Sequence, residues 1–187
     1  MQNYQCQFCK KLFTSFLLFP TKKVFWCSYH MCYICQDCLS DEFSIIPAFI
    51  LKFWNFKKFS ISKNAKDLLE KWHDKPVIHI KHSDSIISQS TLLHTAIVLK
   101  KKIHKIFDLM KCENAEEFAL KTLGNFKYLV LRETLFSLKD LVEISEFRML
   151  LKLEEFLKKF EDHILKDCAV TIPFKIYRYA IIKEVIV

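Results

Sequence analysis

The amino-acid sequence predicts a mainly α-helical fold, preceded by a small cysteine-rich module and followed by short strands. Apolar residues recur at helical spacing between about residues 47 and 167, and a single glycine in 187 residues leaves little room for tight hairpins. Six of the eight cysteines fall within the first 38 residues. Because 51% of the residues are hydrophobic, the chain has enough apolar surface to bury a core.

Residues 47–75 follow the pattern of a helix, a turn and a second helix. Pro47 suits the first turn of the first helix, where a backbone N–H is not needed. A short extended link then leads to Ser62, whose hydroxyl is suited to cap the second helix, and Pro76 follows the end of that helix.

The middle of the chain is predicted to be largely helical. Residues 77–84 are expected to form a loop or a short strand. The longest helical pattern covers residues 85–111, and a shorter helix near residues 114–123 is expected to stop at Gly124. Residues 126–136 are apolar and mixed, and they match neither a helix nor a strand clearly.

The last third of the sequence combines helical and strand patterns. The run from Ser137 to Asp140 resembles an N-terminal capping motif, so a helix is expected to open there. Apolar residues with Lys and Glu between them over residues 145–167 predict an amphipathic helix. Residues 170–187 alternate in polarity and are rich in β-branched side chains, which predicts one or two strands.

Two CxxC pairs, Cys6 with Cys9 and Cys35 with Cys38, mark the cysteine-rich segment. A CxxC turn presents two thiolates to one ion, and two such turns complete a tetrahedral site. We therefore predict that these four residues bind one zinc ion. The ion is expected to be structural, because four thiolates leave no coordination position for a catalytic water.

The cysteines between the two pairs allow other arrangements. Cys27 is the best alternative ligand for the predicted ion, and a second ion held by Cys27, His30 and Cys32 is also compatible with the spacing. The segment offers at most seven ligands, whereas a cross-braced RING domain needs eight. A redox role for the CxxC pairs is not favoured, because no βαβ pattern surrounds them.

The clustering of the cysteines favours a reducing, intracellular environment. The apolar stretch from Leu12 to Phe19 is too short for a signal peptide and has no small-residue cleavage site. No apolar run reaches the length of a membrane span. We therefore expect an intracellular protein with metal-bound thiols.

The remaining histidines and cysteines match no recognised metal or catalytic motif. His73, His79 and His82 lie close together in sequence, and we interpret them as loop histidines. Cys112 is interpreted as a hydrophobic residue on a helix face, and Cys168 as an isolated cysteine. No catalytic Ser/His/Asp elbow, carboxylate pair or phosphate-binding loop is present, so the chain is not expected to be an enzyme.

The net charge of +8 favours anionic partners. The lysines are spread along the chain, however, so a solvated, lysine-rich surface is the favoured explanation of the charge. The aromatic residues fall at helix-core spacing without an interleaved basic stripe, which disfavours nucleic acid as a partner. A basic zinc module that binds nucleic acid or anionic lipid is therefore the second interpretation.

Several runs of the sequence resemble the Rubicon-homology domain, which Rubicon, Pacer and the pleckstrin-homology lysosomal adaptors share. The N-terminal runs are Gln2-Asn-Tyr-Gln-Cys6-Gln-Phe-Cys9, Phe25-Trp-Cys27, Tyr33-Ile-Cys35-Gln-Asp-Cys38 and Ile46-Pro-Ala-Phe-Ile-Leu-Lys-Phe-Trp54-Asn-Phe-Lys-Lys58. Two later runs follow in the family's order, Ala65-Lys-Asp-Leu-Leu-Glu-Lys-Trp72 and Leu135-Phe-Ser-Leu-Lys-Asp-Leu-Val142. The resemblance extends from about residue 2 to Cys168, and the proline-led helix is its most specific part.

The resemblance implies a zinc-binding, helical adaptor domain that acts through protein–protein interactions. Family members bind late-endosomal Rab proteins, which are small GTPases, and act in autophagy and endosome maturation. Some members contact phosphoinositides. We therefore expect a protein that is cytoplasmic and peripheral to the late endosome and lysosome, with a late-endosomal Rab GTPase and a phosphoinositide membrane surface as partners.

The sequence departs from the family pattern in two places. The family continues past the position of Cys168 with a second Cys/His-rich zinc block that contributes to Rab binding, whereas residues 169–187 contain no cysteine. Leu39 stands where the family often has a histidine ligand, and the glycine expected before the second CxxC pair is missing, which makes a second N-terminal zinc ion less expected. We therefore expect weaker Rab binding than in family members that have the second zinc block. We also expect the chain to divide into three segments. They are an N-terminal zinc-binding module at 1–46, the helical body of the Rubicon-homology domain at 47–168, and a divergent or truncated C-terminal segment at 169–187.

Overall fold

The structure is a computed structural model, and it describes residues 4–13, 23–81, 84–110, 112–128, 132, 134–166 and 168. Helices predominate in this part of the chain and the strands are short, as predicted. The chain divides into two compact units. The first unit comprises residues 1–77, 84–90 and 137–139, and the second comprises residues 78–83, 91–136 and 140–187.

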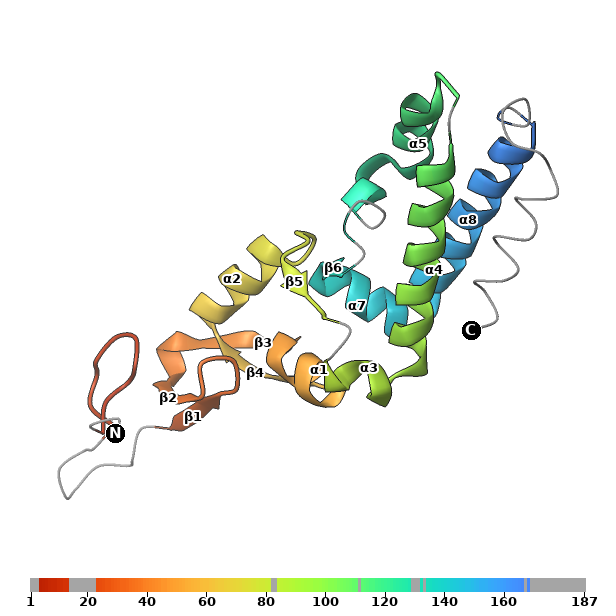
Figure 1. Cartoon of the computed structure of the whole chain (residues 1–187). Helices are drawn as coiled ribbons and strands as arrows, with labels where there is room; N and C mark the ends of the chain where they lie inside the picture. Colours follow the sequence, from red (N-terminus) through yellow and green to blue (C-terminus); the bar gives the residue numbers. More distant parts are fainter. Residues whose placement is uncertain are drawn as a thin grey trace. The chain divides into compact units, whose positions relative to one another are not determined.

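The first unit combines two antiparallel strand pairs with three helices (Figure 1). The strands pair as β1 with β2 and as β3 with β4. The elements are β1 (Val24–Cys27), β2 (Cys32–Cys35), the 3-10 helix η1 (Gln36–Cys38), β3 (Leu39–Ile45), α1 (Pro47–Phe53), β4 (Lys58–Ser62), α2 (Lys63–Trp72) and α3 (Ser85–Gln89).

Local sequence signals set the ends of α1 and α2. Pro47 occupies the first turn of α1, as predicted. Trp54 ends this helix in a left-handed conformation, with φ of 49°, and its backbone N–H donates to the Ile50 carbonyl at 2.8 Å. The Ser62 hydroxyl accepts a hydrogen bond from the Ala65 backbone N–H at 3.1 Å, which confirms the predicted cap of α2.

Strand β4 fills most of the predicted link between the two helices. It pairs with β3 from Leu39 opposite Ser62 to Ile45 opposite Lys58, with a shift in register between Leu39 and Phe43. Helix α2 packs on this strand pair and contributes the buried side chains of Ala65 and Leu69. The pair therefore connects the cysteine-rich segment to the helices that follow it.

The second unit is built around two long helices. Their side chains bury a core of Leu93, Ala96, Ile97, Ile103, Ile106, Met149, Leu150, Leu153, Phe160 and Ile164. The elements are β5 (Ile78–His79), α4 (Thr91–Leu109), α5 (Ala115–Leu123), the 3-10 helix η2 (Gly124–Phe126), β6 (Leu135–Phe136), α7 (Leu138–Ser145) and α8 (Arg148–Lys166). The first two residues of α7 belong to the first unit, and the rest of α7, from Asp140, belongs to the second. Strands β5 and β6 pair antiparallel.

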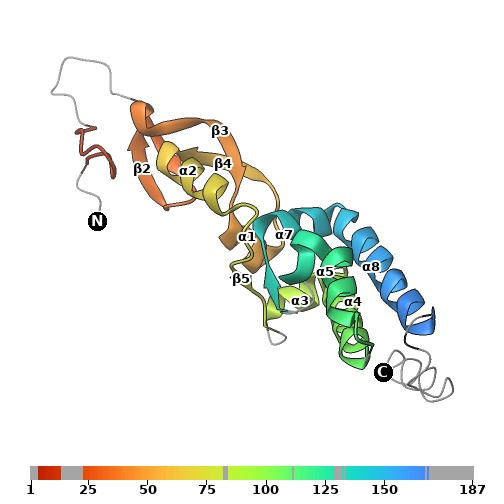
Figure 2. The same ribbon diagram turned by 90° about the horizontal axis from the view of Figure 1, so that it is seen from above.

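Helices α4 and α8 lie side by side and run in the same direction, as Figures 1 and 2 both show. Their C-terminal ends therefore lie close together. Helix α5 also packs on α8, and it stops at Gly124, which has a φ of 51°. The predicted helix stop at this glycine is confirmed, because a positive φ strains any residue with a Cβ.

One sequence prediction needs correction, and another lies outside the described residues. The helix predicted over residues 85–111 is two helices, because Ser90 adopts an extended conformation between α3 and α4. Ser and Thr compete for backbone hydrogen bonds and favour helix ends, which accounts for a break at Ser90 and Thr91. The strands predicted over residues 170–187 lie outside the described residues. Within the described residues, every helix is too short or too polar to traverse a bilayer.

Lys100 lies in the core of the second unit rather than on a solvated surface. Its side chain is fully buried, and its ammonium donates to the carbonyls of Leu135 at 2.9 Å and Arg132 at 3.3 Å. The ammonium also lies 3.8 Å from the centre of the Phe136 ring. The buried charge therefore ties α4 to the segment that forms β6.

We predict that Lys100→Ala destabilises the second unit by about 2–4 kcal/mol, because it leaves two carbonyls without this donor and opens a cavity. Urea unfolding followed by circular dichroism measures the effect. Lys101→Ala removes the neighbouring, partly exposed lysine and serves as the control. Equal stability of the two variants would contradict the structural role of the Lys100 ammonium.

Candidate metal centre

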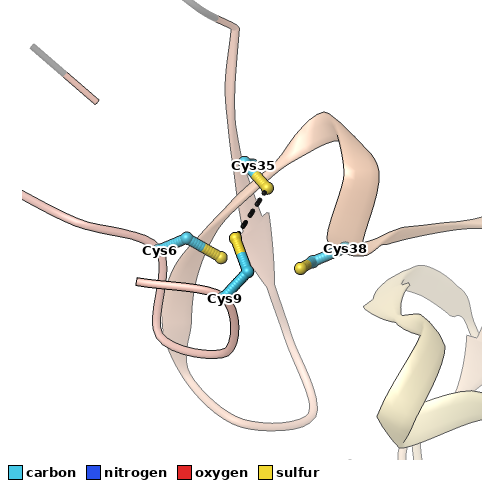
Figure 3. Close-up of side chains that lie close together, drawn as sticks. All are labelled: Cys6, Cys9, Cys35 and Cys38. Carbon is cyan, nitrogen blue, oxygen red and sulfur yellow. Dashed lines mark hydrogen bonds between the residues drawn. The ribbon is translucent and has the colours of Figure 1, made fainter. Parts of the chain in front are cut away.

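The structure brings the four predicted cysteines to one point. The sulfur atoms of Cys6, Cys9, Cys35 and Cys38, called here the cysteine cluster, all lie within 4.8 Å of one another. Figure 3 shows the four side chains converging, with the Cys9 and Cys35 sulfurs 3.5 Å apart. The two CxxC pairs therefore reach one site, although their role as metal ligands stays a prediction.

A tight turn positions the first pair. The Cys6 backbone N–H donates to the Lys11 carbonyl at 2.8 Å, and the Lys10 N–H donates back to the Cys6 carbonyl at 3.0 Å. Gln5 and Leu12 close this turn through an antiparallel bridge. The backbone thus turns both thiols of the first pair to the same side.

The second pair follows the end of the β1–β2 hairpin. Cys35 is the last residue of β2, and η1 turns the chain so that Cys38 faces the same point. The Gln7 backbone N–H donates to the Tyr33 carbonyl at 3.4 Å, and Lys11 forms an exposed ion pair with Asp37 at 2.5 Å. These contacts place the first turn against the second.

The protonation of the cysteine cluster is uneven. Burial raises the pKa of Cys6, but hydrogen bonds from the backbone at Cys35, Cys9 and Phe8 outweigh it and lower the pKa from 9.0 to about 6. Burial and hydrogen bonds with the other three thiols raise the pKa of Cys38 to about 12. Burial also raises the pKa of Cys35. The site therefore offers one preformed thiolate and at least two thiols that a metal ion would deprotonate.

The donor set fits zinc. A tetrahedral Zn²⁺ ion with Zn–S distances of about 2.3 Å separates its sulfur ligands by about 3.8 Å. The Cys9 and Cys35 sulfurs, at 3.5 Å, are close to this separation. Cys6 is fully buried, so an ion bound there would be shielded from water on one side. The geometry and the chemistry of the four sulfurs therefore both suit a structural zinc ion.

Cys27 lies outside the cysteine cluster in this structure. Its sulfur accepts a hydrogen bond from the Ser62 backbone N–H at 3.2 Å and lies 3.6 Å from Nδ1 of His30. Burial lowers the pKa of His30, which favours the neutral imidazole. Cys32 pairs with Cys27 across the hairpin, but the three predicted ligands of a second ion do not bring their ligand atoms within 4.8 Å of one another. Metal binding by Cys27 stays a prediction.

The predicted loop histidines lie apart from the cysteine cluster. Nδ1 of His73 lies within hydrogen-bond distance of the carboxylate of its neighbour Asp74, at 2.8 Å, and the Lys139 ammonium lies 3.5 Å from the same carboxylate. His79 lies on β5, with its Nδ1 3.4 Å from the Thr134 hydroxyl. His82 is outside the described residues.

The sequence predictions missed a second group of residues that could hold a metal ion. Cys112, His163 and Cys168, called here the histidine–cysteine group, bring one ligand atom each within 4.8 Å of one another. The interpretation of Cys112 as a helix-face residue is wrong, because it lies between α4 and α5. The interpretation of Cys168 as isolated is also wrong. The spacing of these residues in the sequence does not predict a metal site, because Cys112 and His163 are 51 residues apart.

Comparison with known proteins confirms the resemblance to the Rubicon-homology domain family. The family model of the Rubicon Homology Domain matches residues 25–172, which include the second CxxC pair and the histidine–cysteine group. The bovine protein associated with UVRAG as autophagy enhancer is 31% identical over 150 residues, which cover 76% of this chain and 22% of that protein. The human pleckstrin homology domain-containing family M member 3 is 25% identical over 166 residues, which cover 87% of this chain and 21% of that protein.

A third relative matches a shorter stretch of this chain. The mouse Run domain Beclin-1-interacting and cysteine-rich domain-containing protein is 28% identical over 118 residues, which cover 62% of this chain and 12% of that protein. The chain thus spans about a fifth of the length of the bovine and human relatives, and less of the mouse relative.

We predict that Cys35→Ser removes one zinc ion per chain, because a serine hydroxyl is a poor replacement for a thiolate ligand. Elemental analysis of the purified protein measures the loss. Cys32→Ser, three residues away and outside the cysteine cluster, is the matched control and should keep the full zinc content. Equal loss from both variants would shift the assignment to the hairpin cysteines.

We also predict that zinc binding at pH 7 releases at least two protons, one each from Cys35 and Cys38, whose pKa values are raised. Because protons compete with the metal for these sulfurs, affinity should rise with pH and fall on acidification. Calorimetry in buffers of different ionisation enthalpy counts the protons. Release of no proton would mean that the thiols are already ionised in the free protein.

Proposed function

Because the chain belongs to the Rubicon homology domain family, we propose that it is a zinc-stabilised adaptor domain that binds a GTP-loaded late-endosomal Rab GTPase. The names of these relatives refer to autophagy and to association with UVRAG or Beclin-1. The proposed setting is accordingly autophagy and endosome maturation, with the protein cytoplasmic and peripheral to late endosomes and lysosomes.

The proposed role of zinc is structural. A bound ion would supply four metal–sulfur bonds that hold the first turn of the chain against the end of β2. The bound ion would also restrain the β3–β4 strand pair. Leu39, the first residue of β3, directly follows Cys38 and pairs with Ser62 at the start of α2. The ion would therefore stabilise the hairpin and the strand pair together.

An exposed aromatic surface on the β1–β2 hairpin supports binding to a protein partner. Trp26 and Tyr33 lie opposite each other on the two strands, and their rings meet edge to face with centres 5.0 Å apart. Trp26 is 40% exposed and Tyr33 is 51% exposed, and the neighbouring Val24 and Met31 are exposed as well. Tryptophan and tyrosine are enriched among the residues that dominate binding energy at protein interfaces.

This hairpin surface lies next to the cysteine cluster in the chain. Tyr33 is two residues before Cys35, so an ion at the cluster would fix the end of the strand that carries it. Fixing the aromatic pair before binding lowers the entropy lost on association. We therefore assign the hairpin surface, formed by Val24, Trp26, Met31 and Tyr33, as the proposed contact with the Rab protein.

A second candidate function is binding to anionic lipid or nucleic acid. The net charge of +8 favours it, and aromatic side chains beside lysines also suit a phosphoinositide membrane surface. Charge-driven binding falls steeply with salt, whereas binding through the aromatic pair does not. The salt dependence of binding therefore separates this candidate from the Rab proposal.

We predict that Trp26→Ala weakens binding to a GTP-loaded late-endosomal Rab by about thirtyfold, the effect of losing about 2 kcal/mol at an interface hot spot. Titration of the full chain against GTP-loaded and GDP-loaded Rab measures both the affinity and the nucleotide preference.

Trp72→Ala is the matched control, because Trp72 is 43% exposed but lies on α2. The control should bind like the wild type. Equal binding to both nucleotide states would contradict the Rab proposal. Binding only to anionic vesicles or oligonucleotides, abolished by salt, would support the second candidate instead.

A further inference from the structure

A groove in the first unit uses neither the cysteine cluster nor the residues of the hairpin surface. It has a volume of about 290 Å³ and lies between helix α2 and strand β3, which pack against each other (Figures 1 and 2). The residues that line it belong to the first unit. Because this volume is at the lower limit for a drug-sized ligand, the groove suits a single side chain better than a large cofactor.

The groove has an apolar floor and an acidic rim. The floor contains the buried side chains of Ile61, Leu69 and Leu138. The rim carries three carboxylates, whose side chains are 66%, 64% and 69% exposed, from Glu42, Glu70 and Asp74. Arginine and lysine combine an apolar stem with a cationic head, so either side chain matches an apolar floor below exposed carboxylates.

Lys66 contacts two of the three carboxylates. Its ammonium lies 2.6 Å from Glu42 and 3.7 Å from Glu70. One ammonium does not neutralise two carboxylates, so this side of the rim keeps an excess of negative charge. Ion pairs with exposed carboxylates are weak, and an incoming cation can therefore compete with Lys66 for them.

The third carboxylate is held in its charged form. Nδ1 of His73 lies 2.8 Å from Asp74, and this hydrogen bond lowers the pKa of the carboxyl group. The Lys139 ammonium, 3.5 Å away, acts in the same direction. With a neutral His73, three carboxylates face two ammonium groups. On a chain whose net charge is +8, this local excess of negative charge favours a cationic ligand.

The edge of β3 offers backbone partners beside the groove. Within the described residues, β3 pairs with β4 alone, so its other edge has no strand partner. After the irregularity between Leu39 and Phe43, its pairing is regular as far as Ile45. Phe43 lines the groove and is 64% exposed. An extended peptide can add to such an edge through main-chain hydrogen bonds, and its side chains then alternate between the two faces.

We propose that this groove binds an extended segment of a partner protein, with one arginine or lysine side chain in the groove and an apolar side chain against Phe43. The stem of the cationic side chain would lie on the apolar floor, and its head would contact Glu42 and Glu70. The backbone of the segment would run along β3. This inference does not rest on the proposed Rab binding, because the groove and the hairpin surface share no residue.

Titration of the full chain with a fluorescent peptide tests the proposal. The peptide has nine residues, with a central arginine between two valines and with serines and threonines at both ends. A matched peptide has citrulline, the neutral analogue of arginine, in the central position. We expect saturable binding of the arginine peptide and about tenfold weaker binding of the citrulline peptide, which lacks the charge-assisted hydrogen bonds.

Two substitutions at the rim should change the affinity in opposite directions. Glu70→Gln removes a negative charge and should weaken binding about threefold, whereas Lys66→Gln removes the competing cation and should strengthen binding about threefold. Glu117→Gln, which replaces an exposed glutamate of α5 in the second unit, is the matched control. Trp26→Ala should also bind the peptide like the wild type, which separates this groove from the Rab proposal.

Two further peptides examine the strand edge. N-methylation of alternate peptide nitrogens blocks hydrogen bonding along one edge of the peptide. Methylation of the edge that faces β3 should abolish binding, whereas methylation of the opposite edge should have little effect. Circular dichroism of each protein variant verifies that its helices and strands remain folded.

Three outcomes would overturn the proposal. The first is the absence of saturable binding of the arginine peptide. The second is equal affinity for the arginine and citrulline peptides. The third is an affinity that neither Glu70→Gln nor Lys66→Gln changes, which would place the bound cation elsewhere. Equal binding of both N-methylated peptides would contradict the addition of a strand to β3.

Discussion

The meeting of four sulfur atoms is the constraint on which the first unit depends. The cysteine cluster joins the turn that Gln5 and Leu12 close to the end of the β1–β2 hairpin, and two of the other links between them are weak. One is a long backbone hydrogen bond, and the other is the ion pair of Lys11 and Asp37, which is exposed and therefore contributes little. A bound ion would outweigh both. The same strand that ends in the cysteine cluster carries Tyr33, so the cluster and the hairpin surface share one element.

The second unit relies on buried polar contacts as well as on apolar packing. Lys100 donates to two carbonyls in its core, and the Tyr128 hydroxyl donates to both oxygens of the buried Asp140 carboxylate. Glu143, also buried, pairs with Lys152 at 2.6 Å. Such pairs are costly to break, because each leaves a charge without compensation. They link α4 to the segment that forms β6, and they link α7 to Tyr128 and to α8.

Sequence signals that act over a few residues predicted their structures well. Pro47 and Ser62 set helix starts because each changes the hydrogen bonding of its own turn, and each CxxC pair is likewise a single turn. The pairing of β3 with β4, the burial of Lys100 and the histidine–cysteine group were not predictable in this way. Each depends on partners tens of residues away, and a lysine inside a helical pattern looks the same whether it faces water or the carbonyl of Leu135.

Exposure is unequal among the four cysteines of the first unit, and this difference bears on how a bound ion would be exchanged. Cys6 and Cys35 are buried, Cys38 is partly covered, and only Cys9 among the four is exposed. A chelator, a competing ion or a donor protein would therefore meet the Cys9 sulfur first and displace the ion stepwise from that edge. The buried sulfurs would be the last to release the ion. Metal exchange would therefore be slow and would proceed by ligand exchange at the exposed Cys9 sulfur, rather than by dissociation of the ion into water.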